Sequence, residues 1–361
     1  MRPVYYLGIF IPAAIVLELT HQDPVVIFGA AALGVIPCAA VMGEATEAIA
    51  ARTGPGIGGL LNVTFGNAPE LIIAFFALNE GLQEVVKASI VGSIIGNILL
   101  VMGAAMVVGG LPRDKQTFSR TAANAQSAML MLALAALIFP AIFQLIHGGG
   151  LPAVGEERVD FGSDLETLSL CVAIVLLVSY VLGLIFSLKT HRAVFNPYDA
   201  AAEEEDVHHW PVRRAAIYLA LSAVAVGVMS EILVGSISEA SEDIGLSEFF
   251  VGVFVVAIVG NAAEHWVAVL VAAKDKMDLA VNIAIGSSAQ IALFVAPVLV
   301  LLSFVIGPNP MALVFNGYEI GALLFAVLIA NLVTQEGESN WFEGVQLLAL
   351  YAVLGLVFYF A

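Results

Sequence analysis

Long apolar segments dominate the sequence and decide which classes of protein it can encode. Of its 361 residues, 60% are hydrophobic and only 12% are charged, whereas soluble domains carry roughly 25% charged residues. The segments are continuous rather than alternating with a period of two, which excludes a transmembrane β-barrel. A helical span needs about 20 apolar residues. We therefore expect an all-α polytopic membrane protein embedded in a lipid bilayer.

Eleven transmembrane helices are predicted from the apolar runs between Pro, Gly and charged clusters. Their ranges are 4–20, 25–51, 57–79, 83–110, 121–147, 164–188, 211–235, 246–273, 277–306, 311–332 and 341–360. No small-residue cleavage pattern precedes His21, so residues 1–23 are interpreted as a retained first helix rather than a signal peptide. Residues 189–210 form an acidic linker, either solvated or cation-sensing.

The distribution of Lys and Arg predicts the orientation. When loops are assigned alternately to the two sides, eleven of the 13 basic residues fall on one side, and only Lys87 and Arg158 on the other. The positive-inside rule then places the N-terminus and the linker in the cytoplasm and the C-terminus outside. A prokaryotic plasma membrane is favoured over an organelle. The net charge of −17 argues against nucleic acid as a partner and favours cations; the oligomeric state stays open.

One motif occurs twice with the same surroundings. GNAPE at 66–70 and GNAAE at 260–264 are each followed by a Gly-Ser pair, which begins 26 residues after the first Gly of the motif. Five crossings separate the copies, and because five is odd the copies run in opposite directions. This predicts two inverted five-helix repeats, residues 24–188 and 211–361, after the extra first helix. Such repeats are typical of secondary transporters, whose sites lie at the repeat interface near the midplane.

Two carboxylates are expected at that depth, Glu70 and Glu264. A charged side chain at the bilayer centre costs at least about 2.5 kcal/mol, so a functional role is favoured over a protonated structural Glu. Asn67 and Asn261 lie three residues before them and hence on the same helical face. Their amide oxygens can join the carboxylates around an ion, or act as hydrogen-bonding groups between helices.

Further oxygen donors lie on the following spans at Ser93, Ser287 and Gln290. Oxygen donors without a Cys or multiple-His cluster favour a hard cation, and the charge of the two carboxylates matches one Ca²⁺ or another divalent ion. No resident cofactor is expected. Without the metal, desolvation and like-charge repulsion raise the proton affinity of the carboxylates, so protons can replace it. His265 either assists proton transfer or is an ordinary hydrogen-bonded histidine.

The helices are expected to be weakened at the level of the motifs by Gly66, Pro69 and Gly260. Close helix packing or a kink is one explanation for these residues. The other is unwound backbone whose carbonyls face the ion, which membrane depth permits only where the backbone lines a cavity.

The paired GNAPE and GNAAEH motifs with their Gly-Ser segments resemble the signature repeats of the calcium/proton exchangers, the CAX family of the calcium/cation antiporter superfamily. The resemblance implies exchange of Ca²⁺ for H⁺ by alternating access. It makes Glu70 and Glu264 the carboxylates that bind Ca²⁺ and protons in turn, with the accompanying ligands Asn67, Asn261, Ser93, Ser287 and Gln290, and with His265 in proton coupling. It also implies that spans 25–51 and 211–235 act as gating helices. Two pairs of acidic residues on or beside these spans either form cation entry funnels at the two faces or are simply solvated at the interface: Glu44 with Glu47, and Glu231 with Glu239.

Three other functions remain as alternatives. A sodium/calcium exchanger of the same superfamily would use similar carboxylates, but the hydroxyls expected before its Glu are missing at Asn67 and Asn261. A passive cation channel could also use midplane oxygens. An intramembrane enzyme is disfavoured, because the chain lacks His-Glu-x-x-His, a Ser/His/Asp arrangement and a Gly-rich phosphate loop.

Overall fold

The computed structural model describes residues 3–154, 163–190 and 210–361. Within these ranges the chain is helical, apart from one antiparallel pair of two-residue strands, β1 (Gln116–Thr117) and β2 (Glu338–Ser339). Nine helices of the described part are long and apolar enough to cross a membrane, or ten if one bent pair counts as a single span, and a shorter apolar helix covers Val4–Leu19. The predicted all-α polytopic membrane protein is confirmed, while the count of eleven crossings stays a prediction. Most of the predicted acidic linker lies outside the described residues.

The described residues divide into two compact units. Unit 1 comprises Met1–Phe76 and Tyr180–Ile244, and unit 2 comprises Ala77–Ser179 and Gly245–Ala361. This division follows compactness and not sequence relatedness, so the two predicted repeats, 24–188 and 211–361, stay a prediction.

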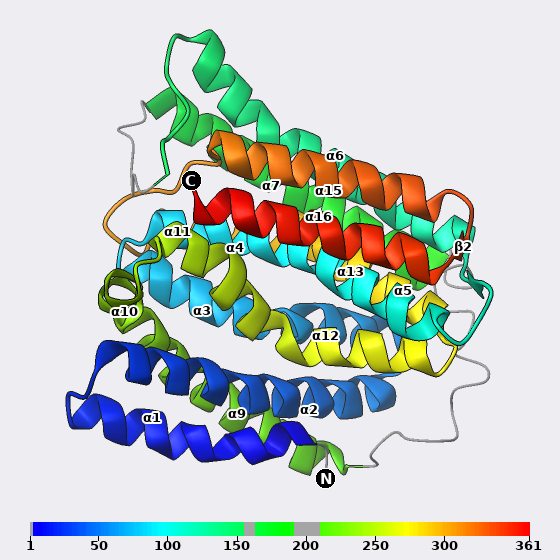
Figure 1. Ribbon diagram of the computed structural model, residues 1–361, viewed down its shortest axis with the longest axis horizontal. Helices are drawn as coiled ribbons and strands as arrows, with labels where there is room; N and C mark the ends of the chain where they lie inside the picture. The colour runs from blue at the N-terminus through cyan, green and yellow to red at the C-terminus, as the bar shows by residue number, and fades with distance from the viewer. Residues whose placement is uncertain (1–2, 155–162, 191–209) are drawn as a thin grey trace. The chain divides into compact units, whose positions relative to one another are not determined.

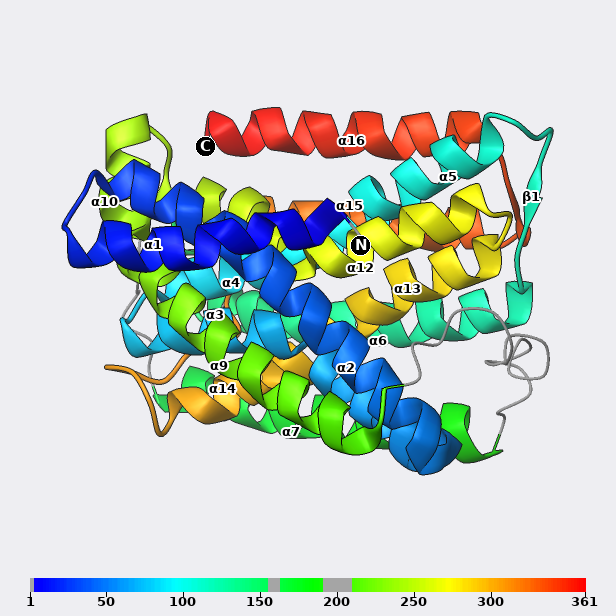
Figure 2. The same ribbon diagram turned by 90° about the horizontal axis from the view of Figure 1, so that it is seen from below.

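Unit 1 is built around two long helices, α2 and α9, which pack against each other and against α1 (Figures 1 and 2). Cys38 and Met42 of α2 and Val226 of α9 form a buried apolar cluster between them. The elements of this unit are η1 (Pro3–Ile9), α1 (Phe10–Leu19), α2 (Pro24–Gly66), most of α3 (Ala68–Asn79), the end of α7 (Ser163–Ile185), η3 (Phe186–Thr190), α9 (Val212–Gly235) and α10 (Ile237–Ile244).

The first motif copy interrupts its helix, as predicted, whereas the second copy does not. The chain bends by 44° between Leu60–Gly66 and Ala68–Asn79, but α12 continues through Gly260 without a break. Pro69 explains the difference, because proline has no N–H to donate to the carbonyl four residues earlier and its ring clashes with that carbonyl. The second copy has Ala263 at this position, so weakening at Gly260 was a wrong prediction.

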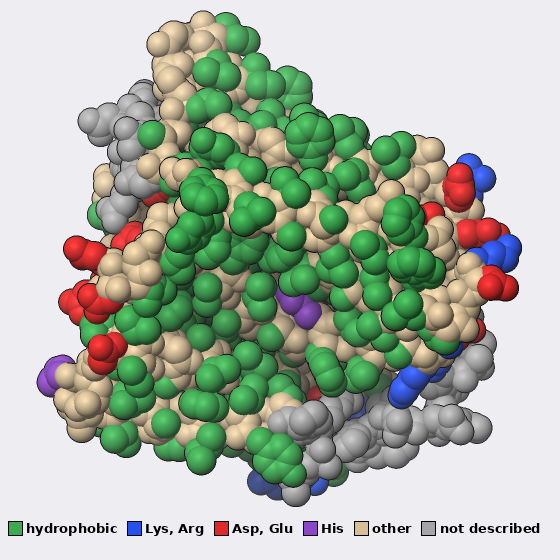
Figure 3. All heavy atoms as spheres, viewed as in Figure 1, with side chains coloured by type: hydrophobic (Ala, Val, Ile, Leu, Met, Phe, Trp, Pro, Cys, Tyr) green, Lys and Arg blue, Asp and Glu red, His purple; other side chains and the backbone are tan. Residues whose placement is uncertain are grey.

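Unit 2 contains the remaining helices, which surround a core of mostly aliphatic residues. Its elements are α4 (Gln83–Ile95), η2 (Gly96–Val101), α5 (Met102–Gly110), α6 (Arg120–Ile146), most of α7, α11 (Glu248–Phe250), η4 (Val251–Val256), α12 (Ala257–Ala273), α13 (Met277–Gln290), η5 (Ile291–Val295), α14 (Ala296–Ser303), α15 (Gly317–Thr334) and α16 (Trp341–Tyr359). Apolar side chains cover the outer faces of α15 and α16 (Figure 3), among them Phe325, Leu332 and Leu356. A lipid environment accounts for this exposure.

Glycines let the helices of unit 2 approach closely at two crossings. Gly92 of α4 lies against the backbone of Val253, and Gly252 lies against Ala88. Gly103 of α5 and Gly344 of α16 meet at the second crossing. Small residues at helix contacts are the usual means of tight packing in a membrane. The first crossing fixes α4, which carries Glu84, Lys87 and Ser93, described below.

The loops of unit 2 lie at its two ends, as expected if successive helices cross the membrane in alternate directions. At one end Arg113 pairs with Asp275 at 3.0 Å and Lys115 with Glu338 at 2.8 Å, and β1 pairs with β2. At the other end Gly81 approaches Pro308, and Gly307 approaches the backbone of Leu78. Consequently α4 and α13 begin at opposite ends and run antiparallel, which is the direction the inverted repeat predicts for this pair.

The tenth predicted span, 311–332, began too early. Residues Met311 to Asn316 are buried but not helical, and α15 starts at Gly317 with a capping box formed by Asn316 and Glu319. The apolar run from Met311 to Phe315 was read as helix because periodicity does not distinguish a short buried extended segment from a helix. Side chains from neighbouring elements satisfy its backbone, as described below.

Candidate cation site

The eight predicted site residues are divided between the two units. Asn67 and Glu70 belong to unit 1, at the junction of α2 and α3. The other six belong to unit 2, on α4, α12 and α13. The convergence of Glu70 with Glu264 on one ion stays a prediction, and the geometry that follows concerns unit 2.

Asn261 of α12 is held in a defined orientation. Its Nδ2 donates to Ser93 Oγ at 2.9 Å and to the carbonyl of Ala257 at 2.9 Å. A carbonyl can only accept a hydrogen bond, so the bond to Ala257 determines which end of the amide is nitrogen. The oxygen Oδ1 is buried and makes no hydrogen bond. Asn261 therefore offers a fixed, unsatisfied oxygen one helical turn before Glu264.

His265 forms a second contact of the same kind. Its Nε2 lies 3.0 Å from Asn97 Oδ1. Since His265 follows Asn261 by four residues and Asn97 follows Ser93 by four, the two contacts lie one turn apart on the same pair of helices. With the amide of Asn97 in this orientation, Nε2 carries the proton and Nδ1 of the neutral ring is the acceptor.

Glu264 is joined to the helix that follows it. Ser287 Oγ of α13 donates to Glu264 Oε2 at 2.7 Å, and the neighbouring Ser288 donates to the carbonyls of Ala284 at 2.8 Å and Ile94 at 3.4 Å. The carboxylate is partly buried, and Ser287 is 6% exposed. A hydroxyl that donates to a carboxylate can turn its lone pairs toward a bound cation instead.

Gln290 belongs to the same helix as Ser287, three residues further along and partly buried at the end of α13. The structure thus brings Ser93, Asn261, Glu264, His265 and Ser287 into one set of paired contacts in unit 2. For Gln290 it establishes the helix and the partial burial, and its role as a ligand stays a prediction.

Wide π-helical turns directly follow the polar residues in both halves. Gly96–Val101 comes after Ser93, and Ile291–Val295 comes after Ser287 and Gln290. A third π-helical stretch, Val251–Val256, precedes Asn261. Such turns are rare overall, but they occur frequently at functional sites. They rotate the residues beyond them and alter the hydrogen bonding of the backbone. Their matching positions support a common origin of the two helices.

The pairing of Asn97 with His265 was not predicted. The signal available in the sequence was spacing, because Asn97 follows Ser93 by the same four residues that separate His265 from Asn261. These two spacings lie side by side because Gly92 of the Gly-Ser pair packs against Val253, just before α12, a contact that the motif does not predict.

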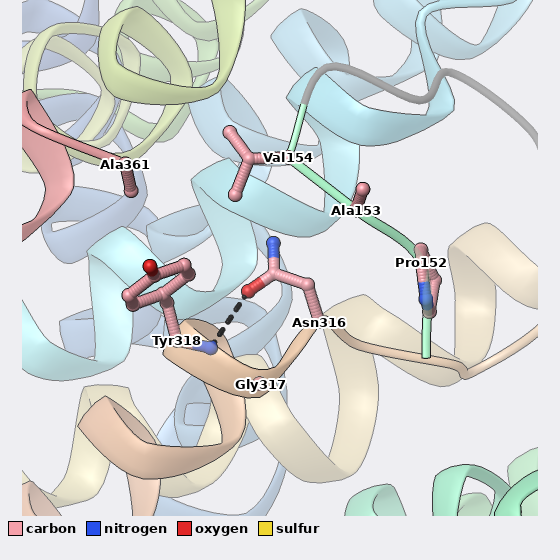
Figure 4. A pocket seen from close by; sticks show the side chains of 7 residues that line it. All are labelled: Pro152, Ala153, Val154, Asn316, Gly317, Tyr318 and Ala361. Atoms are coloured by element: carbon pink, nitrogen blue, oxygen red, sulfur yellow. Dashed lines mark hydrogen bonds between the residues drawn. The ribbon is translucent and has the colours of Figure 1, made fainter. Parts of the chain in front are cut away.

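A cavity lined by other residues lies away from this set. It has a volume of about 550 Å³ and opens at the N-terminus of α15, where Asn316 Oδ1 accepts from the backbone N–H of Tyr318 at 3.0 Å (Figure 4). Its lining is Pro152, Ala153, Val154, Asn316, Gly317, Tyr318 and Ala361. Among the described residues, no three His, Cys, Asp or Glu side chains gather as a metal site.

Comparison with known families gives a match across most of the chain. The family model described as sodium/calcium exchanger protein matches residues 24–189 and 214–360. A Ca(2+)/H(+) antiporter of Aphanothece halophytica is 46% identical over 367 residues, covering 98% of this chain and 95% of that protein. The Ca(2+)/H(+) antiporter ChaA of Bacillus subtilis is 43% identical, covering 97% of this chain and 96% of its own length.

A solved structure agrees with these relatives. The crystal structure of the selenium-substituted Ca2+/H+ antiporter protein YfkE superimposes with a TM-score of 0.83 at 38% identity, covering 100% of both chains.

Proposed function

The chain belongs to the sodium/calcium exchanger family, and from this premise we propose that it is an antiporter that exchanges Ca²⁺ for H⁺. The observation that carries the proposal is near-full-length identity of 43–46% to proteins named as Ca(2+)/H(+) antiporters. This agrees with the CAX-type motifs and disfavours the sodium-coupled alternative. At the family level it also fits a transporter rather than an enzyme.

Glu264 and Glu70 carry the exchange in this proposal. Each binds either Ca²⁺ or protons, and the pair is neutralised by one Ca²⁺ or by two protons. Asn261 Oδ1 supports the role of Glu264, because it is a buried acceptor on the same helix with its amide orientation already determined. Ser287 supports it as well, since its hydroxyl donates to Glu264 at 2.7 Å. Charge neutralisation before movement makes the exchange obligatory, because a net charge at bilayer depth is costly.

Alternating access is assigned to α2 and α9. These helices pack on each other in unit 1, whereas α4, α12 and α13 belong to unit 2. The grouping supports the expectation that the second and seventh spans move together. Glu231 of α9 lines a cavity of about 240 Å³ with Glu18 of α1, which favours it as a cation entry point.

The proposed location is a prokaryotic plasma membrane, with the N-terminus in the cytoplasm and the C-terminus outside. The basic loops at one end of unit 2 support this orientation, because Arg113, Lys115 and Lys274 lie on loops that meet there.

Radioactive calcium uptake into sealed proteoliposomes tests the function. Uptake that requires an imposed pH gradient, and that collapses with a protonophore plus valinomycin and potassium, is expected. Uptake driven only by a sodium gradient would move the protein to the sodium-coupled branch. Equilibration of calcium without accumulation in any gradient would indicate a passive channel.

A further inference from the structure

A second buried polar cluster lies on α4, nearer its beginning than the cation site. Lys87 is 6% exposed, Glu84 is 5% exposed and Glu319 of α15 is 1% exposed. Glu319 and Glu84 are the charged groups that act on the Lys87 ammonium. A lone buried ammonium or carboxylate is strongly unfavourable in a protein interior. The single positive charge of Lys87 therefore offsets one of the two carboxylate charges, and without it both carboxylates would be buried with no positive group acting on them.

The cluster fastens a stretch of buried, non-helical backbone. Lys87 Nζ donates to the carbonyl of Val314 at 3.0 Å, and Glu319 Oε2 accepts from the backbone N–H of Asn316 at 2.8 Å. Within the same stretch, Ser169 Oγ accepts from the N–H of Leu313 at 3.0 Å. Buried backbone outside a helix needs such partners because neither water nor helical bonds satisfy it. Lys87 is the partner that comes from α4.

Lys87 is linked by its helix to the cation site. It precedes Ser93 by six residues on α4, or about 9 Å along the helix axis. Ser93 receives the hydrogen bond that orients Asn261. A displacement or rotation of α4 at Lys87 would therefore be transmitted to the amide whose oxygen faces the ion.

The opposite end of unit 2 has a related contact. Asp278, in the first turn of α13, accepts a hydrogen bond from the backbone N–H of Ser119, the N-cap of α6. Thus α4 and α13, which carry the hydroxyls Ser93 and Ser287, are each attached near their first turn to the chain just before another long helix. The recurrence of this arrangement on antiparallel helices favours a role in positioning over a local packing accident.

We propose that Lys87 is a positioning residue of the antiporter: it attaches the buried segment Met311–Asn316 to α4 through the carbonyl of Val314 and offsets one of the two nearby carboxylate charges, and thereby holds Ser93 against Asn261. The proposal rests on the Ca²⁺/H⁺ exchange proposed above. It predicts that loss of Lys87 weakens calcium binding through a displaced α4 rather than through loss of a ligand.

Calcium uptake kinetics of Lys87→Met, normalised to folded protein, test this role. The KM for calcium is expected to rise about tenfold, a coupling of ordinary size between distant sites, while Lys87→Arg stays within about twofold of wild type. Lys274→Met is the matched control, because Lys274 is exposed at the other end of unit 2. A folded Lys87→Met protein with the KM of wild type would overturn the proposal, even if its melting temperature fell.

The double variant Lys87→Met/Glu319→Gln covers the case in which Lys87→Met fails to fold. Removing one positive and one negative charge restores the formal charge of the cluster, and Gln can still accept from the backbone of Asn316. We expect the double variant to fold even where Lys87→Met alone does not and, where Lys87→Met does fold, to have a higher melting temperature in detergent than Lys87→Met. If the double variant does not recover stability in this way, the idea of charge compensation is overturned. This melting comparison does not depend on transport activity, so failure of the positioning role can be distinguished from failure of the exchange function. Failure of the exchange function would already be seen in the wild-type protein.

Discussion

Two polar networks share helix α4 but are bonded differently. At the candidate cation site, the contacts of Ser93 with Asn261, Asn97 with His265 and Ser287 with Glu264 join one side chain to another. Around Lys87, side chains bind backbone groups of the segment before α15. A contact between two side chains can be exchanged for a contact with an ion by rotamer changes alone. A contact with backbone fixes the course of the chain and is not exchanged without moving it.

The largest effect is expected at Glu264, the carboxylate of the side-chain network. Glu264→Gln keeps an oxygen that can accept from Ser287, so the fold should survive, but it removes both the charge and the proton-binding group. Proton-driven calcium uptake should fall by about 100-fold or more, or about 2.7 kcal/mol. Reconstituted vesicles loaded with equal amounts of protein provide the measurement, with Glu338→Gln as the matched control. Wild-type flux in the Glu264 variant would refute the assignment.

Asn261 tests whether an oriented amide contributes to ion binding. Asn261→Ala removes the buried oxygen and the hydrogen bond to Ser93. The KM for calcium should increase about tenfold, equivalent to about 1.4 kcal/mol, with a smaller change in maximal rate. Asn331→Ala applies the same substitution to α15, where Asn331 accepts from Gln335, and should leave the KM unchanged. Equal KM values for both variants would assign Asn261 to helix packing.

His265 distinguishes proton coupling from structural hydrogen bonding. His265→Ala removes the ring that lies against Asn97, while the two proposed transport carboxylates remain. The dependence of the uptake rate on pH should change shape without complete loss of transport. Initial rates measured at several external pH values, with the pH difference across the vesicle membrane held constant, reveal such a change. His147→Ala, at an exposed histidine, is the comparison variant, and identical profiles would return His265 to a structural role.

Much of the first network was predictable from sequence, and little of the second. The duplicated motif and its 26-residue spacing identified Asn261, Glu264 and Ser287 because ligand chemistry is local and repeated. Lys87 gave no comparable signal. The equivalent position in the second motif copy is Val281, which is not charged. The partner of Lys87, Val314, lies in an apolar run whose sequence resembles that of a helix. Contacts between side chains and distant backbone depend on tertiary packing, which residue patterns do not encode directly.

Ser169 measures the strength of the backbone contacts without changing a charge. Ser169→Ala leaves the buried N–H of Leu313 without its acceptor, at a cost of about 1–3 kcal/mol. The melting temperature in detergent should fall, whereas the KM for calcium should stay that of wild type because Ser169 is not on α4. Ser89→Ala is the control, since Ser89 donates to a carbonyl within its own helix. A large rise in KM for Ser169→Ala would mean that the segment itself, and not α4, positions the site.

The smallest effect is expected where both partners of a charge pair are exposed. Lys115 and Glu338 approach to 2.8 Å, with side chains 61% and 50% exposed, so water and salt compete with the pair and its contribution is about 0–1 kcal/mol. Glu338→Gln should therefore change neither uptake nor melting temperature measurably, and added salt should make no further difference. Thermal unfolding in detergent at low and high salt checks this. A fall in melting temperature as large as that of Ser169→Ala would mean that the β1–β2 end contributes as much to stability as the buried segment. Solvent exposure would then not distinguish weak contacts from strong ones in this protein.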